Sequence, residues 1–213
     1  MKFKCIIFDC DGVLVDSEAI SAKIFQKMAA ELGFKIDFET ILEQITGTSM
    51  TKNLKFFSEN INGELPEDFE TEFRKRSFEA FKTDLKPIKG VHDLLERISI
   101  PVGVASSGPV EKIKLNLTTT NLIDYFDDNI FSCYEIGSWK PEPEIYLNAA
   151  KKMGFKPGEC VVIEDSLAGV QSAKAGGFNV FGFTNGKNKN SLEELGATVF
   201  SDMGELGKLL DLD

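Results

Sequence analysis

The stretch FKCIIFDCDGVLVDSE, residues 3–18, decides the fold and raises the first chemical question. Its apolar beginning, which has the length and composition of a buried strand, is followed by Asp9, Asp11 and Asp16, with Gly12 between the last two. Carboxylates so close to an apolar core and to one another are costly to ionise unless a cation or a proton compensates them. We therefore expect a neutralising group at the end of this strand.

The composition is that of a globular protein. The 213 residues are 42% hydrophobic and 27% charged, enough for one large domain or two modest ones with a real core. No run of about 18 apolar residues occurs and the N-terminus does not resemble a signal peptide, so we expect a cytoplasmic protein with no membrane partner. The net charge of −10 disfavours a nucleic-acid surface.

The cysteines and the histidine do not indicate a catalytic or metal site. Cys5, Cys10, Cys133 and Cys160 show no CxxC pairing, which favours reduced core residues over zinc ligands or disulfides. His92 follows a glycine at an expected helix start and is interpreted as a surface or capping residue. Because no serine or cysteine elbow motif accompanies it, a triad hydrolase is not predicted.

The hydrophobic pattern divides the chain into two parts. Apolar residues recur at helical spacing through the segment after the first strand, which predicts helices over residues 17–34, 38–46, 51–61 and 66–82, with a break at 47–49. From Pro87 onward short apolar runs alternate with amphipathic helices, which predicts a parallel sheet covered on both faces. The expected strands are 101–106, 129–136, 160–165, 179–183 and 197–202, and the expected helices are 91–99, 111–119, 144–154, 166–177 and 203–212. We predict an α/β protein: a Rossmann-like three-layer core of residues 1–16 and 85–213, with a small α-helical cap inserted at 17–84.

Polar side chains follow several of the expected strands. Ligands of open α/β sheets bind outside the carboxyl ends of the strands. The residues expected at that edge are Asp9, Asp11, Ser106, Ser107, Lys140, Glu164 and Asp165. Strands are about 5 Å apart, so these groups could surround a pocket of phosphate size. Taken singly, each residue has another interpretation. Ser106 could cap a helix, Lys140 could be a solvated surface side chain, and Glu164 with Asp165 could be acidic residues that interact favourably with a helix dipole. Four converging acids with oxygen ligands only indicate Mg²⁺ rather than zinc.

Four stretches, DCDGVLVDS, ASSG, KPEPEIY and IEDSLAGVQSA, resemble the four ordered motifs of the haloacid dehalogenase superfamily. They are similar to its phosphatase and phosphomutase branch, in which a helical cap follows the first motif, and the resemblance covers essentially the whole chain. It implies that Asp9 is the nucleophile and Asp11 the general acid/base. It further implies phosphate binding by Ser106 and Lys140, with Ser107 and Gly12 as further candidates, and a Mg²⁺ shell of Asp9, the Asp11 carbonyl, Asp165 and Glu164.

The resemblance also narrows the reaction. β-Phosphoglucomutases carry a cap histidine and a cap arginine where this chain has Ser21 and Met50, and without that histidine Asp11 would be less restrained from activating water. We therefore predict hydrolysis, and the motifs look most like bacterial sugar phosphatases similar to 6-phosphogluconate phosphatase. A phosphomutase and a non-catalytic phosphate-binding regulatory module stay as alternatives. Dehalogenation is not expected, because it does not use Mg²⁺ chemistry.

Two further features concern binding. Lys52, after GTSMT, could reach distal oxygens of a small phosphorylated substrate, or could be a solvated lysine at a helix start. The stretch GFTNGKNKN, residues 182–190, fails the P-loop template because Asn188 stands where Ser or Thr is needed, so we predict a polar loop. We expect a monomer, with a dimer as the alternative.

Overall fold

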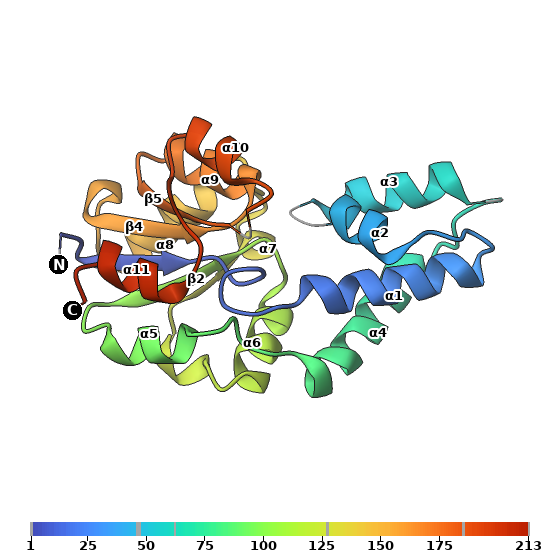
Figure 1. The fold of residues 1–213 in the computed structure, drawn as a ribbon, viewed down its shortest axis with the longest axis horizontal. Coiled ribbons are helices and arrows are strands. Elements are labelled where there is room, and N and C mark those ends of the chain that lie inside the picture. Colours follow the sequence, from blue (N-terminus) through green and yellow to red (C-terminus); the bar gives the residue numbers. More distant parts are fainter. Residues whose placement is uncertain (1, 46–47, 62, 127, 185, 213) are drawn as a thin grey trace. The chain divides into compact units, whose positions relative to one another are not determined.

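The computed structural model describes residues 2–45, 48–61, 63–126, 128–184 and 186–212. The chain forms two compact units, one of Met1–Val15 with Pro87–Asp213 and one of Asp16–Lys86. The boundaries predicted from the sequence, after residues 16 and 84, lie one and two residues from these. Figure 1 shows the ribbon of the chain with its helices and strands labelled.

The first unit is built on a parallel sheet. Its strands in the described residues are β1 (Cys5–Phe8), β2 (Val102–Ser106), β3 (Ile130–Ser132), β4 (Cys160–Glu164), β5 (Asn179–Phe183) and β6 (Thr198–Phe200). Their order is β3-β2-β1-β4-β5-β6. β1 lies at the centre, with Ile6 aligned to Val102 on one side and to Val161 on the other. The chain therefore extends the sheet first in one direction from β1 and then in the other, and the carboxyl ends of β1 and β4 flank the switch point at which such sheets bind ligands.

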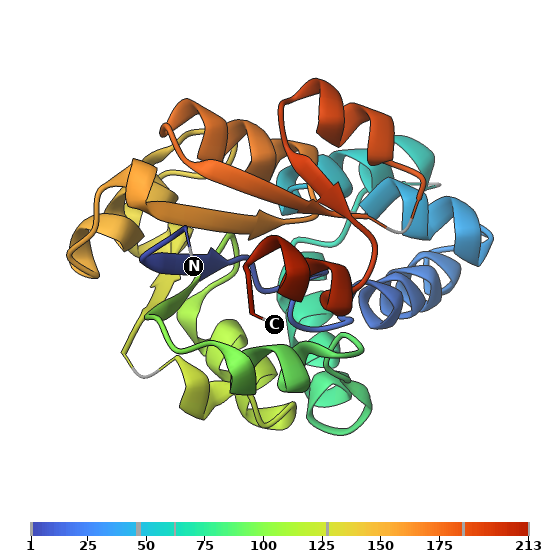
Figure 2. The same ribbon diagram turned by 60° about the vertical axis from the view of Figure 1, so that its left-hand side comes forward.

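Helices cover both faces of this sheet (Figure 2). One face carries α5 (Val91–Arg97), α6 (Val110–Thr119) and α11 (Met203–Leu209), and the other carries α8 (Glu144–Lys152), α9 (Leu167–Ala175) and α10 (Lys189–Glu194). Short 3₁₀ turns occur at Ile123–Tyr125 and Pro157–Glu159. Side chains of β1 alternate between the layers: Cys5 and Ile7 join the core cluster with α8, α9 and α10, whereas Phe8 meets Phe126 edge to face, with ring centroids 6.2 Å apart. The predicted three-layer α/β fold is confirmed.

Two short helices differ from the prediction. The expected strand 129–136 ends at Ser132, whose side chain accepts a hydrogen bond from the Tyr134 N–H and starts α7 (Cys133–Ile136), which Gly137 ends at φ +73°. The expected polar loop 182–190 passes into α10 at Lys189, and position 185 lies outside the described residues. Both helices are too short to show a helical period in the sequence.

The second unit is helical, as predicted, with α1 (Glu18–Glu31), α2 (Phe38–Ile45), α3 (Met50–Asn60) and α4 (Phe69–Asp84). Its core is rich in phenylalanine: the ring of Phe25 stacks on Phe73, with centroids 3.7 Å apart, and on Phe57, at 5.0 Å. The predicted break at 47–49 falls partly outside the described residues, which omit 46 and 47. Ser49 caps α3 by accepting from the N–H of Lys52.

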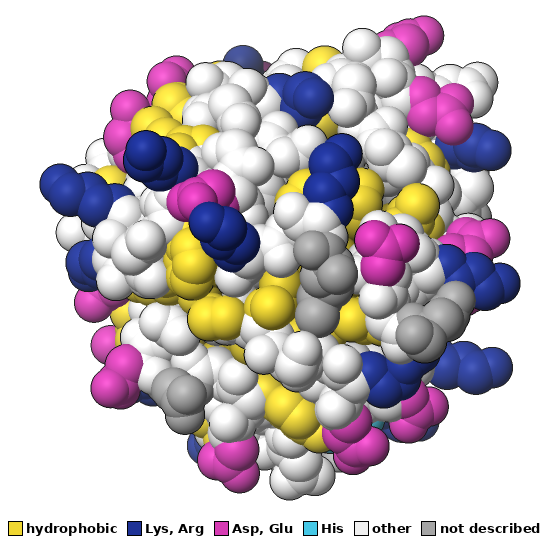
Figure 3. Space-filling view, turned by 90° about the vertical axis from the view of Figure 1, so that its left-hand side faces the viewer, with side chains coloured by type: hydrophobic (Ala, Val, Ile, Leu, Met, Phe, Trp, Pro, Cys, Tyr) yellow, Lys and Arg dark blue, Asp and Glu magenta, His cyan; other side chains and the backbone are white. Residues whose placement is uncertain are grey.

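Surface and core agree with the expectations from composition. Cys5, Cys10, Cys133 and Cys160 are all buried and free. His92 is half-buried and its Nε2 lies 3.0 Å from the carbonyl oxygen of Thr120. None of the helices in the described part of the chain combines the length and hydropathy that a transmembrane span requires. On the face shown in Figure 3, basic and acidic side chains are interspersed among the described residues.

Replacing Phe25 with alanine tests the core of the helical unit. Phe25 is 1% exposed and stacks on three rings, those of Phe57, Phe69 and Phe73, so Phe25→Ala should cost about 3–5 kcal/mol of unfolding free energy. Urea denaturation followed by circular dichroism measures the loss. Lys27→Ala, an exposed change on the same helix, is the control, and equal midpoints for the two variants would contradict this packing.

Candidate active site

Asp9 follows β1 and is held at the sheet by its backbone. Its N–H donates to the carbonyl of Ile163 in β4 at 2.9 Å, which continues the β1–β4 ladder by one residue. The chain then turns away tightly: Gly12 adopts φ +83°, and its N–H donates to the carbonyl of Val15. The carboxylate of Asp9 is therefore presented at the carboxyl edge of the sheet, with its residue only 7% exposed.

Lys140 links Asp9 to the end of β4. Its Nζ lies 2.6 Å from Asp9 Oδ1 and 2.7 Å from Glu164 Oε1, and its side chain is 6% exposed. Lys140 precedes α8 in a turn closed by a bond from the Glu142 N–H to the Trp139 carbonyl. A solvated surface lysine, the alternative interpretation of this residue, is wrong.

Glu164 is fully buried and both of its oxygens accept hydrogen bonds. Oε1 accepts from Lys140 and from the Tyr146 hydroxyl at 3.0 Å. Oε2 accepts from the N–H groups of Asp165 and Ser166 at 2.8 and 2.7 Å, and from the Ser166 hydroxyl. Ser166 is the N-cap residue of α9. Glu164 thus places its negative charge at the N-terminus of this helix and also binds Lys140.

The pKa values of this group reflect burial and close charges. Burial raises the pKa of Asp9 to about 7; Lys140 opposes this rise, and the Glu164 carboxylate adds to it. Burial alone would lower the pKa of Lys140, but Asp9 and Glu164 hold it well above its ordinary value. Burial and the Glu164 charge also raise the pKa of Tyr146, which keeps its hydroxyl a hydrogen-bond donor.

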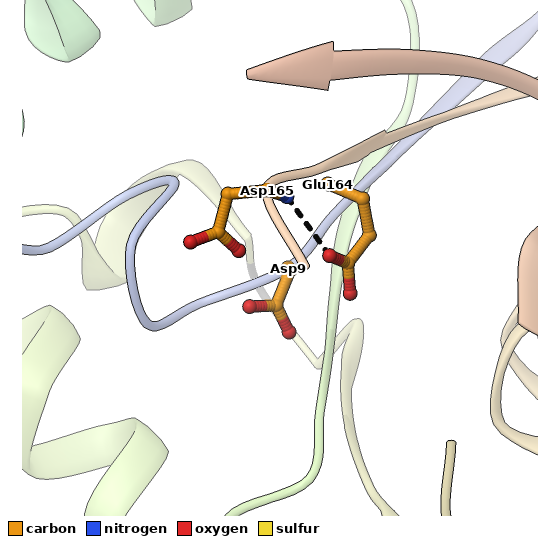
Figure 4. A group of neighbouring side chains, drawn as sticks. All are labelled: Asp9, Glu164 and Asp165. Atoms are coloured by element: carbon orange, nitrogen blue, oxygen red, sulfur yellow. Dashed lines mark hydrogen bonds between the residues drawn. The ribbon is translucent and has the colours of Figure 1, made fainter. Parts of the chain in front are cut away.

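Asp165 brings a third carboxylate to the same place. Oxygens of Asp9, Glu164 and Asp165 lie within 4.8 Å of one another, and Figure 4 shows the three side chains grouped at the strand ends. Asp165 lies against the open side of Gly12, where an added Cβ would be 2.1 Å from Oδ2. Three clustered carboxylates with oxygen donors only fit a hard divalent cation such as Mg²⁺.

Asp11 faces helix α6, which was not foreseen. Lys112 Nζ lies 2.7 Å from Asp11 Oδ2, and Asn116 Nδ2 lies 3.3 Å from Oδ1. Burial alone would lower the pKa of Lys112, but Asp11 raises it above its ordinary value. The two residues are one helical turn apart, so their side chains lie on the same face of α6.

The serines end a neighbouring strand. Ser106, the last residue of β2, is 2% exposed, and its Oγ accepts from the Gly108 N–H at 3.1 Å. Helix α6 begins after Pro109 without a side-chain cap, so the interpretation of Ser106 as that helix's cap is wrong. Ser107 is exposed, and its Oγ lies 4.0 Å from the Cys133 sulfur. Ser132, also not foreseen, donates to the Gly108 carbonyl at 2.6 Å and holds this loop.

The edge of the sheet thus brings together Asp9, Lys140, Glu164 and Asp165, with Gly12 against them. Asp11 lies on the same loop as Asp9, and Ser106 ends the adjacent strand. Lys52 belongs to the other unit, exposed on the first turn of α3, and its role stays a prediction.

Comparison with known proteins agrees with the motifs. A family model described as haloacid dehalogenase-like hydrolase matches residues 3–177. The 6-phosphogluconate phosphatase of Escherichia coli (strain K12) is 31% identical over 98% of this chain and 95% of its own length. The phosphorylated carbohydrates phosphatase of Thermotoga maritima is 31% identical over 97% of this chain and 98% of its own length.

Solved structures give the same result for the fold. The crystal structure of a conserved haloacid dehalogenase-like protein from Agrobacterium tumefaciens is 32% identical, superimposes with a TM-score of 0.87, and covers 98% of both chains. A family match over most of the chain and relatives matched along almost their whole length leave one conclusion. The chain belongs to the haloacid dehalogenase-like hydrolases.

Proposed function

We propose that this hydrolase is a Mg²⁺-dependent phosphatase that releases phosphate from a small phosphorylated metabolite, most simply a sugar phosphate. The observation that carries the proposal is the buried contact of Lys140 with Asp9, next to the carboxylates of Glu164 and Asp165. A phosphoric monoester hydrolase also agrees with the names of the two phosphatase relatives, both of which act on phosphorylated compounds.

Asp9 is the proposed nucleophile. Lys140 holds its Oδ1, which fixes the direction of the carboxylate, and the ammonium charge offsets the repulsion between a carboxylate and a phosphoryl group. Attack by a carboxylate oxygen on phosphorus breaks the ester bond and forms an aspartyl-phosphate. Water then attacks this phosphorus, which releases inorganic phosphate and restores Asp9.

Asp11 is the proposed general acid/base. In the first step it protonates the leaving alcohol oxygen, and in the second it takes a proton from the attacking water. Lys112 and Asn116 each bind one of its oxygens, so α6 supports the residue that moves these protons. Ser106 is proposed to bind the phosphoryl group beside Lys140, with Ser107 and Gly12 as weaker candidates.

The Mg²⁺ ligands proposed are Asp9, Asp165 and the Asp11 backbone carbonyl. When bound, the ion supplies positive charge that polarises the phosphoryl oxygens. Glu164 completes the shell directly only by giving up one of the hydrogen bonds that its oxygens already accept. We assign the choice of substrate to the helical unit, including Lys52.

Removing the nucleophile gives the first test. Asp9→Asn should lower phosphate release from an aryl phosphate in the presence of Mg²⁺ by at least about a thousandfold, because an amide cannot form the acyl-phosphate bond. Asp16→Asn, the same change at an exposed aspartate, should keep the rate within about twofold. Wild-type turnover in Asp9→Asn would show that the nucleophile is wrongly assigned.

A pair of glycines tests the place of Asp165. Gly12 and Gly33 both have positive φ, +83° and +78°, but an added Cβ meets Asp165 at 2.1 Å only at Gly12. Both alanine variants should lose about 1–2 kcal/mol of stability from backbone strain. Only Gly12→Ala should also raise the Mg²⁺ concentration for half-maximal activity, by roughly tenfold or more. Equal Mg²⁺ dependence of the two variants would contradict the assignment.

A panel of phosphorylated metabolites separates hydrolysis from transfer. The phosphatase proposal expects inorganic phosphate from one or more sugar phosphates, only when Mg²⁺ is present. Conversion of β-glucose 1-phosphate to glucose 6-phosphate faster than phosphate is lost would establish a phosphomutase instead. Binding of phosphate esters with no turnover on any of them would indicate a regulatory module.

A further inference from the structure

A residue beyond the sequence motifs contacts the backbone of the candidate metal site. Asn188 follows β5, the neighbour of β4 in the sheet, and its Nδ2 donates to the backbone carbonyl of Asp165 at 2.8 Å. The sequence suggested only a polar loop here. Two carboxyl-end loops are thus joined by a side-chain amide, next to one of the proposed Mg²⁺ ligands.

The amide of Asn188 is oriented by Thr184. The Thr184 hydroxyl accepts from the Gly186 N–H at 3.0 Å, so its proton is free to be donated to Asn188 Oδ1, 2.5 Å away. The Asn188 oxygen is therefore the acceptor of this pair, and the nitrogen is turned to the Asp165 carbonyl. Thr184 is itself only 5% exposed and is tied to β6 by its N–H, so the orientation rests on a rigid support.

The peptide group between Asp165 and Ser166 is consequently held on both sides. Its carbonyl accepts from Asn188, and its N–H donates to Glu164 Oε2 at 2.7 Å. Two opposed hydrogen bonds therefore hold this peptide plane, and the plane includes the Cα atom that carries the Asp165 side chain. These two hydrogen bonds therefore help to position the Asp165 carboxylate through its backbone.

The side chain of Asn188 does not cap the helix that it precedes. It occupies the N-cap position of α10, where asparagine ordinarily accepts from an N–H of the first turn, yet its side chain makes no cap hydrogen bond. Its oxygen accepts from Thr184 and its nitrogen donates to Asp165 instead. A purely local role in starting α10 does not explain this geometry.

We propose that Asn188, oriented by Thr184, is a positioning residue that holds the Asp165 peptide in the geometry required for Mg²⁺ binding. The inference rests on the proposed function for its metal. Partners that orient metal ligands in this way commonly account for a factor of roughly ten to a hundred in metal affinity.

Titration with Mg²⁺ alone, without substrate, tests the inference. Isothermal calorimetry and the rise in melting temperature with MgCl₂ give the affinity of each variant. Asn188→Asp keeps the size and the acceptor of the side chain but places an oxygen against the Asp165 carbonyl. Asn190→Asp, an exposed position on α10 two residues away, makes the same change of charge and is the matched control. We expect Asn188→Asp to bind Mg²⁺ roughly ten- to a hundredfold more weakly than wild type and Asn190→Asp to bind within about twofold of it.

A second pair of variants keeps the test decisive if Asn188→Asp folds poorly. Thr184→Val removes the hydroxyl that orients the amide and should also weaken Mg²⁺ binding, whereas Thr184→Ser keeps the hydroxyl and should restore it. Unchanged affinity in folded Asn188→Asp or in Thr184→Val would overturn the inference, as would a wild-type protein that binds no Mg²⁺. A wild type that binds Mg²⁺ but releases no phosphate would overturn the proposed function and leave this inference standing.

Discussion

The candidate site depends on two buried ion pairs, which the ammonium group of Lys140 forms with Asp9 and with Glu164. Each carboxylate ends a different strand, and the lysine comes from a third segment, so one charge ties three parts of the chain together. Removing charges from water costs several kcal/mol per ion, and the cost is recovered only when the remaining hydrogen-bonding capacity is satisfied. Tyr146, and the backbone and hydroxyl donors at the start of α9, satisfy that capacity around Glu164.

This balance of charge also limits what the site can do. Three carboxylates, Asp9, Glu164 and Asp165, face one ammonium, and three minus one leaves two negative charges in a small volume. Burial and the charge of Glu164 accordingly raise the pKa of Asp9 to about 7, although Lys140 opposes this rise. A divalent cation relieves the excess negative charge without protonating the nucleophile, and the combined charge of the cation and Lys140 then favours an incoming phosphoryl group. The two excess negative charges, which are unfavourable for folding, therefore favour the binding of a cation, and the cation in turn favours an anionic substrate.

The sequence predicted the residues that stand at strand ends, because topology alone brings such residues to one edge. Asp9, Lys140 and Asp165 followed from the alternation of strands and helices together with the motif resemblance. Lys112 and Tyr146 were not predicted, because on an amphipathic helix a polar residue near the core looks like part of the solvated face. Their partners are more than 15 residues away in the chain, and only the packing of α6 and α8 on the sheet selects them.

The same reasoning explains why the sequence predicts a polar loop at 182–190, which includes Asn188 and the first two residues of α10. A six-residue helix carries too few apolar positions to show a period, and Asn188 looked like one polar residue among several. The fold was insensitive to this error, because the order of the strands does not depend on α10. The site was sensitive to it, because Asn188 contacts the loop that carries Asp165.

Two glycines leave the space that the carboxylates of Glu164 and Asp165 occupy. Gly169 lies in the first turn of α9, where alanine would favour the helix by about 1 kcal/mol, yet an added Cβ would lie 1.6 Å from Glu164 Oε1. Gly12 leaves the corresponding space for Asp165. The helix thus gives up intrinsic stability so that the Glu164 carboxylate can lie against its first turn and accept from the two N–H groups just before it. Space for the acids, donors for their oxygens and one buried ammonium are three requirements of a single arrangement, and a change in any of them would displace the others.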